Sequence, residues 1–221
     1  MPEIALSYAK KSLVNLYPEE AFLVTSNYEK IIKGNLSKLF SQPPSPLHRS
    51  LGAEKSGESL LLRAFGQDCS IDHEKVTLSR SEVVDPKGLI VSLYALHANP
   101  EQLQLEPFKS FKDFPGSMPY QGAFSANSER VLVPHVPLIK EREEDIKAVF
   151  DGEDGHDGDF SFILYPLPKI ALYYIFYLPD EDFPASVTSL FCANALSFMP
   201  LDGLADVAEY TSKEIIRLVK K

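Results

Sequence analysis

The sequence predicts an α+β domain with a mostly antiparallel sheet. Apolar, β-prone runs stand at residues 60–79 and 160–178, helical spacing marks both ends of the chain, and further helical patterns lie between the two strand regions. Strands interleaved with helices in this order favour an antiparallel sheet covered by helices. We expect one sheet built from both strand regions, helices at the N-terminus, and two C-terminal helices packed on one face of the sheet.

The N-terminal segment, residues 1–42, is predicted to be helical. Its apolar side chains recur at helical spacing before Pro18, which marks a break and a new first turn, so we predict a helix pair. Residues 27–40 fit neither the helical nor the strand period cleanly, and we favour a helix over an edge strand. The apolar positions of the first helix are Ile4, Tyr8, Ala9, Leu13 and Leu16.

Residues 43–58 are predicted to be an irregular connection. The stretch SQPPSPLHRS, which begins at Ser41, gathers three prolines with serines and cannot sustain a regular pattern of backbone hydrogen bonds. Residues 59–221 then hold the sheet and its covering helices. At 221 residues the whole chain, 1–221, is compatible with a single domain.

The first strand region is predicted to be a hairpin of two strands around a polar turn. Leu60, Leu62 and Ala64 alternate on one side of the turn, and Val76 and Leu78 alternate on the other.

Two helices and an aromatic loop are predicted between the strand regions. Asp85 supplies an N-cap for the first helix, which ends before Asn99, and the second helix spans Pro137 to Phe150 with the charges EREED facing water. Between them, LEPFKSFKDFPGSMPYQGAF concentrates aromatic residues among prolines and glycines. We expect a loop with at most a short strand, whose rings another part of the fold must bury.

The second strand region, FSFILYPLPKIALYYIFYLP, predicts two strands joined at Pro166 and Pro168. Its second run is apolar on both faces and is the candidate central strand. Pro184 is expected to open a helix with Asp182 as its cap, and Asp202 is expected to cap the last helix.

The acidic composition limits the partners of the chain. A formal net charge of −9 repels phosphate backbones, so nucleic acid is not an expected partner. The longest apolar run, residues 170–178, is too short to cross a bilayer as a helix, and no signal-peptide core opens the chain, which indicates a cytoplasmic protein with no membrane partner. Cys69 and Cys192 belong to no CxxC pair, so we expect two reduced, packed thiols.

An ordered set of motifs from about Phe65 to Arg217 carries a family resemblance. The set comprises LIVSLYALHA, FKSFKDFPGSMPYQGAF, LPKIAL, YLPDEDFPASVTSLF and a helix after MPLD. Because it contains these motifs in this order, the chain resembles the bacterial and archaeal proteins grouped as domain of unknown function 3786. Members usually carry tryptophan before the phenylalanine-rich loop and ahead of DEDFP, whereas this chain has none and Tyr177 stands near the second place.

The resemblance implies a shared fold and an anaerobic, cofactor-related setting, and it supplies no catalytic residues. Some members join this domain to a cysteine-rich iron–sulfur module that these 221 residues do not contain, so cluster binding is not carried over.

The stretch DGEDGHDGD, residues 151–159, raises the question of a metal site. Calcium takes six to eight oxygen ligands, which short acidic loops can provide. An EF-hand loop starting at Asp151 would have Gly155 at its fifth position and Phe162 at its twelfth, and a nonapeptide calcium repeat would need tandem copies. We therefore predict no metal and a solvated turn, in which Gly152 ends the preceding helix and Gly155 and Gly158 take positive φ.

Candidate ligand-binding residues gather near the FPGS turn at residues 114–117. The turn has neither the glycine spacing nor the lysine of a P-loop, but several aromatic and polar residues lie near it in sequence or by helix spacing. The carboxylate cluster in LPDEDFP supplies two further candidate residues. The candidates are Tyr94, His97, Asp113, Tyr120, Asp180 and Asp182. No G-x-S-x-G elbow and no zinc-binding histidine motif occurs, so catalytic residues and any cofactor are left open.

Three functions are compatible with these observations. The first is a small-molecule or cofactor-binding or accessory protein whose aromatic loop lines the site, with corrinoid, haem and flavin as the ligands to test. The second is an enzyme of unknown reaction that uses Asp113, Asp180 or Asp182 as acid/base groups, which requires two of them to converge in a cleft. The third is a module that docks on another protein through an apolar strand or helix face.

Overall fold

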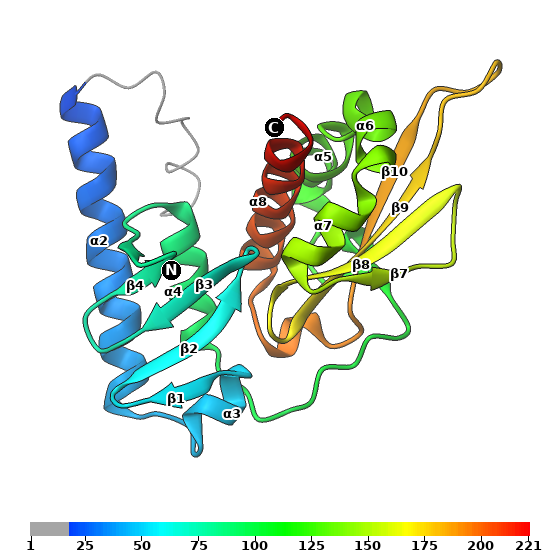
Figure 1. Cartoon of the computed structure of the whole chain (residues 1–221). Coiled ribbons are helices and arrows are strands. Elements are labelled where there is room, and N and C mark those ends of the chain that lie inside the picture. The colour runs from blue at the N-terminus through cyan, green and yellow to red at the C-terminus, as the bar shows by residue number, and fades with distance from the viewer. Residues whose placement is uncertain (1–17) are drawn as a thin grey trace.

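The computed structural model describes residues 18–221, with side chains from residue 27 onward. Within this range the strands form two five-stranded antiparallel sheets, so the α+β class with mostly antiparallel pairing is confirmed (Figure 1). The prediction of one shared sheet is wrong, because the two strand regions pair only within themselves. The helix predicted before Pro18 lies outside the described residues.

The first sheet is a meander of five strands, not the predicted hairpin. Residues 67–71, assigned to the polar turn, form a strand of their own in which Cys69 and Ile71 point inward and are buried. The chain turns back over Phe65 and Gly66, whose φ values of 50° and 72° are those of a tight two-residue hairpin turn. In order, the strands are β1 (Glu54–Ser56), β2 (Ser59–Ala64), β3 (Gln67–Ile71), β4 (Val76–Leu78) and β5 (Ser81–Glu82).

Three helices accompany the first sheet. The helix α2 (Pro18–Ser41) confirms the helical assignment of residues 27–40, and α4 (Pro86–Leu96) confirms the helix capped by Asp85, whose carboxylate accepts the Gly88 N–H at 2.9 Å. The segment 43–58 is more regular than predicted, since it contains the short helix α3 (Leu47–Leu51) and β1. Leu51 is fully buried, and that burial holds this turn of helix against the core.

The second sheet has β9 at its centre, as predicted. β9 is buried along most of its length on both faces, which suits its aromatic and β-branched residues. The helix predicted after Pro184 is wrong, because residues 186–191 form β10 and pair with β9. Across the sheet the strands are β6 (Lys109–Ser110), β10 (Ser186–Phe191), β9 (Ile170–Tyr177), β8 (Phe160–Leu167) and β7 (Glu153–Asp154).

The helices of the second half differ from the prediction in three respects. The helix expected from Pro137 to Phe150 is broken at Arg142 into α6 (Val136–Glu141) and α7 (Glu143–Phe150). Only one of the two expected C-terminal helices is present in the described chain, namely α8 (Leu201–Val219). Pro200 stands at the N-cap of α8, and Asp202 lies in its first turn without being the cap.

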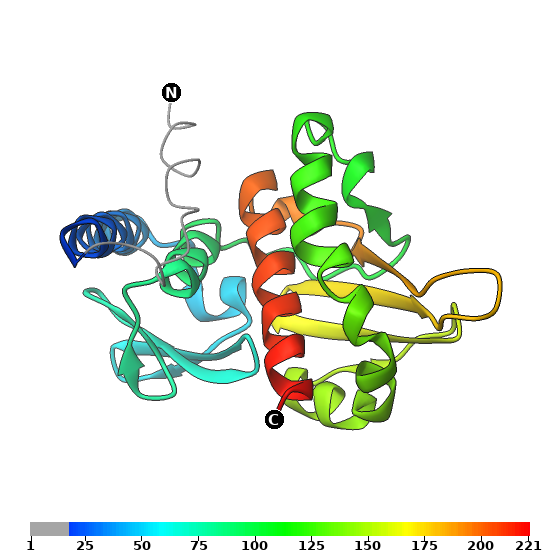
Figure 2. The same ribbon diagram turned by 90° about the horizontal axis from the view of Figure 1, so that it is seen from above.

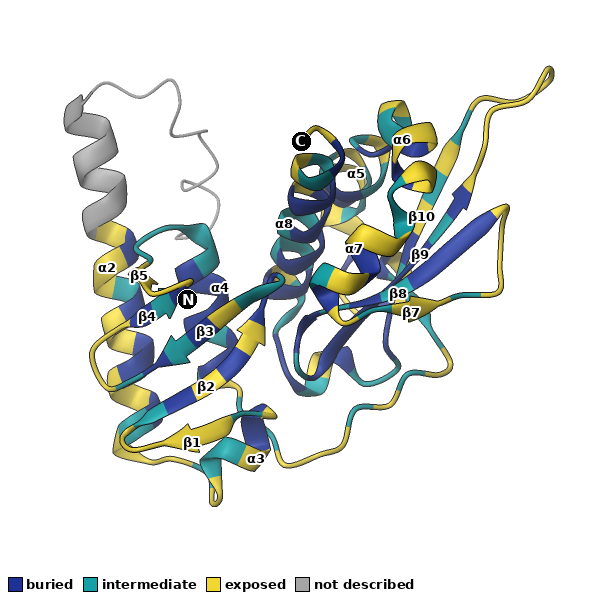
Figure 3. Cartoon of the chain, in the orientation of Figure 1, coloured by how far each residue is buried: buried dark blue, intermediate teal, exposed yellow. Residues whose placement is uncertain are grey.

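The helix α8 lies between α4 and the second sheet (Figures 1 and 2). On one side Lys87 of α4 pairs with Glu214 of α8 at 3.0 Å, and on the other the hydroxyls of Tyr174 in β9 and Ser212 in α8 are 3.2 Å apart. Buried apolar residues from both halves form one hydrophobic cluster, visible in dark blue along α8, β8 and β9 in Figure 3.

No helix among the described residues is long and apolar enough to span a bilayer.

Candidate functional site

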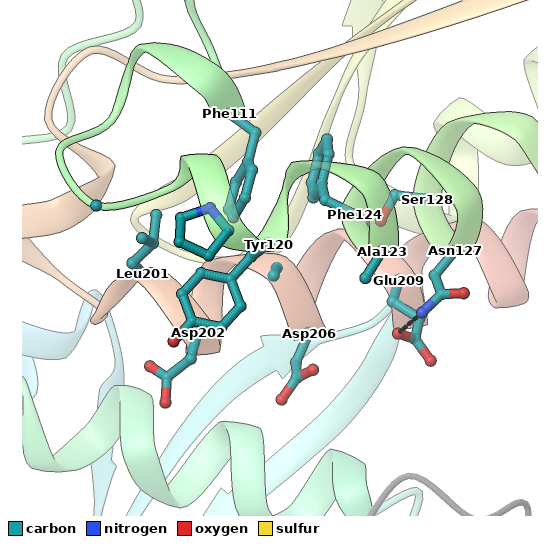
Figure 4. A pocket seen from close by; sticks show the side chains of 13 residues that line it. Phe111, Tyr120, Ala123, Phe124, Asn127, Ser128, Leu201, Asp202, Asp206 and Glu209 are labelled. Carbon is teal, nitrogen blue, oxygen red and sulfur yellow. Dashed lines mark hydrogen bonds between the residues drawn. The ribbon is translucent and has the colours of Figure 1, made fainter. Parts of the chain in front are cut away.

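A cleft of about 680 Å³ opens between α8 and the aromatic-rich segment 111–128 (Figure 4). The segment folds as a series of short helical turns, and α8 supplies the opposite wall. The turns are η2 (Phe111–Asp113), η3 (Met118–Tyr120), α5 (Gln121–Phe124) and the π-helix η4 (Ser125–Arg130). The prediction that residues 105–124 form a loop with at most a short strand is wrong from residue 111 onward, because these helical turns form there, and they supply one wall of the cleft.

The aromatic wall is held by ring packing. Phe111 and Phe124 stack with their ring centroids 4.2 Å apart and 6° between their planes, and both rings contact Phe191 of β10. All three are buried. Tyr120, by contrast, is 51% exposed and lies where the cleft meets solvent. The wall thus combines a fixed apolar surface with one accessible aromatic ring.

The α8 wall is acidic. Asp202, Asp206 and Glu209 line the cleft at spacings of four and three residues, which places them on one face of the helix. Glu209 accepts hydrogen bonds from Asn127 at 3.0 Å and from Lys213 at 2.8 Å, and Asp202 accepts the Gly203 N–H at 2.9 Å. Among the described residues that line the cleft, none is basic.

Two tyrosines beside this wall have raised pKa values, and its carboxylates are among the causes. Burial raises the pKa of Tyr28, and the carboxylates of Asp206 and Asp85 raise it further. Burial likewise raises the pKa of Tyr210, and the charge of Glu209 adds to that effect. The carboxylates on this face of α8 therefore add to the effect of burial on the pKa of both tyrosines.

Three buried polar atoms in the aromatic segment have no hydrogen-bond partner among the described residues. They are Ser117 Oγ, Gln121 Oε1 and Ser128 Oγ. A buried polar group without a partner costs roughly 1–3 kcal/mol, so such groups are uncommon in folded chains. Ser128 belongs to the π-helix η4 and lines the cleft beside Phe124 (Figure 4). Short π-helical segments occur frequently at functional sites.

Of the six candidate residues, Tyr120 alone lines this cleft. Tyr94 is buried and its hydroxyl donates to the Leu51 carbonyl at 2.8 Å, which ties α4 to α3. His97 is exposed at the end of α4, with Nδ1 2.9 Å from the Leu93 carbonyl. Asp113 is also exposed and accepts the Ser110 N–H at 3.2 Å as part of a capping box.

Asp180 and Asp182 lie in the exposed connection between β9 and β10, which projects from the body of the molecule (Figure 1). Asp180 accepts the N–H groups of Asp182 at 2.8 Å and Phe183 at 2.7 Å, the pattern of an Asx turn. Asp182 caps no helix, because β10 follows it. With Asp113 also exposed, the three carboxylates do not converge in the cleft, so the geometry gives no support to acid/base chemistry by them.

The acidic stretch 151–159 follows α7 and is not only the predicted solvated turn, because Glu153 and Asp154 form the edge strand β7 of the second sheet. Tyr173 of β9 organises it: its hydroxyl accepts the N–H groups of His156 and Asp157 at 3.0 and 3.1 Å and donates to the Asp157 carboxylate at 2.7 Å. Lys147 pairs with Glu144 at 2.6 Å and also with Asp154. No group of three or more metal-ligating side chains is found in the described part of the chain.

The glycines of this stretch act differently from the prediction. Asp151, not Gly152, ends α7 in the left-handed region, with φ of 51°. Gly158 takes a positive φ of 69° as predicted, but Gly155 does not. Glycine is needed at position 155 because the backbone there packs closely against two side chains. A Cβ at this position would lie 2.4 Å from Ser161 Oγ and from Tyr173 Cε2.

Both cysteines are buried free thiols, as predicted. Burial raises the pKa of Cys69 to about 12 and that of Cys192 to about 11, which removes the thiolate needed for nucleophilic chemistry at neutral pH. Cys192 follows β10 and does not lie in the helix expected there.

The α8 carboxylates and Ser128 were not among the residues predicted from the sequence. The spacing of Asp202, Asp206 and Glu209 was readable as one helical face, but the apolar residues of the same helix dominated its interpretation. No sequence pattern around Ser128 marks it as a candidate. It becomes one because it is buried where its carbonyl contacts Ser212 of α8.

Comparison with known proteins gives one family match. A family model described as a domain of unknown function, DUF3786, matches residues 43–214, which begins earlier than the resemblance seen from residue 65. No curated protein and no solved structure matches the chain.

Proposed function

Because the chain belongs to the DUF3786 family, whose description assigns no activity, we propose a function from the geometry of the cleft: a binding or accessory protein that takes a small molecule between α8 and residues 111–128. The volume of about 680 Å³ falls within the range of small-molecule sites, which is roughly 300–1,000 Å³. Such sites are mainly apolar with a few placed polar groups, and this cleft has that composition.

The observation that carries the proposal is the unpartnered hydroxyl of Ser128, which is buried and belongs to a residue that lines the cleft. Ser117, Gln121 and Ser128 lie within twelve consecutive positions of the segment, and Ser128 itself lines the cleft. A fold selected for stability alone would pair or replace such groups, since each costs free energy when buried alone. The retention of Ser128 is explained if a molecule bound in the cleft supplies the missing hydrogen bond to its hydroxyl.

Native mass spectrometry of protein purified from its own source tests the proposal. We expect a retained mass, or saturable quenching of tyrosine fluorescence by a corrinoid, haem or flavin. The variant Ala123→Phe places a ring in the cleft and should abolish retention and quenching. Ala126→Phe is the matched control, because Ala126 is also exposed on the neighbouring turn but does not line the cleft. Equal binding by both variants would place the ligand elsewhere and contradict the proposal.

A further inference from the structure

A second cleft, of about 530 Å³, lies at one end of the first sheet, where α2 ends and α3 and β1 begin (Figure 1). The strands of this sheet pair antiparallel in sequence order, so the β1–β2 turn and the β3–β4 turn emerge at the same end. None of the described residues that line this cleft also lines the cleft beside α8. Its volume falls within the range of small-molecule sites, roughly 300–1,000 Å³.

The apolar lining of this second cleft consists mainly of rings. Phe40, at the end of α2, packs against His73 of the β3–β4 turn with ring centroids 4.0 Å apart and 32° between their planes. Leu60 of β2 lies beside them and is 5% exposed. Proline rings lose almost no conformational freedom when a ligand covers them. The prolines of the lining are Pro43, Pro44 and Pro46.

Lys55 of β1 brings a positive charge to this apolar lining. Lys55 and Leu60 are partners across β1 and β2, so their side chains project from the same face of the sheet. Lys55 is exposed and lines the cleft, and its ammonium group makes no hydrogen bond or ion pair with any described residue. The charge is therefore available to an anion that enters the cleft.

Two imidazoles and one carboxylate complete the polar lining. His48 of α3 and His73 can each donate a hydrogen bond from a ring N–H. Glu58, in the β1–β2 turn, is the single acidic side chain among the described residues that line this cleft. One lysine beside one carboxylate suits a ligand with one negative charge better than a ligand with two.

We infer that this second cleft binds an aromatic carboxylate. The ring of the ligand packs against Phe40 and the prolines, its carboxylate pairs with Lys55, and an imidazole of the lining donates a hydrogen bond to the same carboxylate. The site is separate from the cleft beside α8 and goes beyond the proposed function. The preference for an anion weakens as ionic strength rises, because Lys55 is exposed to solvent.

Lys55 also has a possible role that needs no ligand. It belongs to β1, an edge strand, and a lysine on such a strand prevents the edge from pairing with another chain. The two roles predict different results for one substitution. Loss of a ligand contact changes affinity for an anion, whereas loss of edge protection promotes self-association.

Three indole probes that differ in charge test the inference. Indole-3-acetate carries one negative charge, tryptophol is neutral, and tryptamine is cationic. The protein contains no tryptophan, so indole fluorescence and its anisotropy report the probe alone. We expect indole-3-acetate to bind about fivefold more tightly than tryptophol, and tryptamine to bind most weakly.

Variants then assign the charge preference to Lys55. Lys55→Gln should lower the affinity for indole-3-acetate to that for tryptophol and leave the affinity for tryptophol unchanged. Lys75→Gln is the matched control, because Lys75 is an exposed lysine next to His73 in the β3–β4 turn that does not line the cleft. Ala123→Phe, which alters the cleft beside α8, should also change neither affinity.

Nuclear magnetic resonance of the histidine side chains locates the probe without any variant. The chain has five histidines, of which His48 and His73 line this cleft. Titration with indole-3-acetate should shift the imidazole signals of these two. The signals of the other three should stay in place, namely those of His97, His135 and His156.

Several outcomes would overturn the inference. One is equal affinity for indole-3-acetate and tryptophol, and another is no saturable binding of indole-3-acetate at all. Self-association of Lys55→Gln with unchanged affinity for indole-3-acetate would leave Lys55 with edge protection alone. Binding that is lost in Ala123→Phe and leaves His48 and His73 unshifted would place the probe in the cleft beside α8, which contradicts this inference and supports the proposed function.

Discussion

Glu214 shows at the scale of one residue how the two halves of the molecule are joined. Only 4% of its surface is exposed, and its carboxylate is held by Lys87 of α4 at 3.0 Å and by Arg217 Nε of α8 at 2.6 Å. Burial alone would raise the pKa of Glu214, but the hydrogen bonds and charges of Arg217 and Lys87 outweigh burial and hold that pKa below its usual value. The ion pair therefore stabilises the folded chain at neutral pH.

Replacing Glu214 by glutamine should lower the free energy of unfolding by about 1–3 kcal/mol near neutral pH, because Lys87 loses its partner. The folded pKa of Glu214 lies below the unfolded value of about 4.3, so its contribution is fully present above that pH and is lost as the pH falls through the folded pKa. Urea unfolding followed by circular dichroism should show the difference from wild type shrinking in acid.

The exposed pair of Arg63 and Asp68 provides the control for this prediction. The side chain of Asp68 is 88% exposed, so Asp68→Asn should change the free energy of unfolding by no more than about 0.5 kcal/mol. A Glu214→Gln effect as small as that, or one that grows in acid, would contradict the role assigned to the buried pair.

At the scale of elements, the acidic connection 151–159 is shaped by close packing against β8 and β9. Ser161 and Tyr173 hydrogen-bond to the backbone of this stretch, and Gly155 lies where any side chain would meet them. Gly34 presents the opposite case: it lies in the described part of α2, is exposed, and would place a Cβ in open space.

Substituting alanine for each of these two glycines should change stability in opposite directions. Gly155→Ala should destabilise the protein by about 1–3 kcal/mol, since its Cβ must displace hydrogen-bonded side chains. Gly34→Ala should stabilise it by roughly 0.5–1 kcal/mol, because alanine favours a helix interior over glycine. Thermal and urea unfolding of both variants measures the two effects. A neutral Gly155→Ala would show that the stretch can move away from β9.

The elements also show how far sequence patterns predict this fold. Periodicity was sufficient for α4, and apolar, β-prone composition was sufficient for β8 and β9, whereas residues 27–40 of α2 fit neither period cleanly. It failed for β10, because SVTSLF follows a proline and suits either a helix or a strand until β9 offers an edge to pair with. It failed again at the turn between β2 and β3, since Phe65 is not a residue that usually adopts positive φ.

Only the aromatic wall of the candidate cleft could be predicted from the sequence. The aromatic stretch 105–124 stands out in the sequence because so many rings among prolines and glycines need burial, and Tyr120 became a candidate in this way. The acidic face of α8 is readable from its spacing, but its place opposite Ser128 is not, because the two come together only when α8 packs against η4, a contact between segments about eighty residues apart. Spacing along the chain carries no information about that contact.

At the scale of the whole molecule, the two sheets share one core. Phe65, in the turn between β2 and β3, is fully buried, and its N–H donates to the Pro166 carbonyl of β8 at 2.7 Å. Its ring also lies 5.7 Å from Lys87 Nζ, the lysine that pairs with α8. The first sheet is therefore joined to the second through one aromatic residue and through the ion pair on α8.

From this arrangement we expect the described part of the chain to unfold as one cooperative unit, although it contains two sheets. Phe65→Ala removes a buried ring from the shared core and should cost about 3–5 kcal/mol. Amide hydrogen exchange should then accelerate by the same factor in β3 and in β9, since both depend on the same global opening. Leu61→Ala, at a 40% exposed position of β2, should leave exchange in both strands nearly unchanged. Loss of protection in β3 with full protection retained in β9 would instead show two units that fold separately, and the shared core would not be the source of their stability.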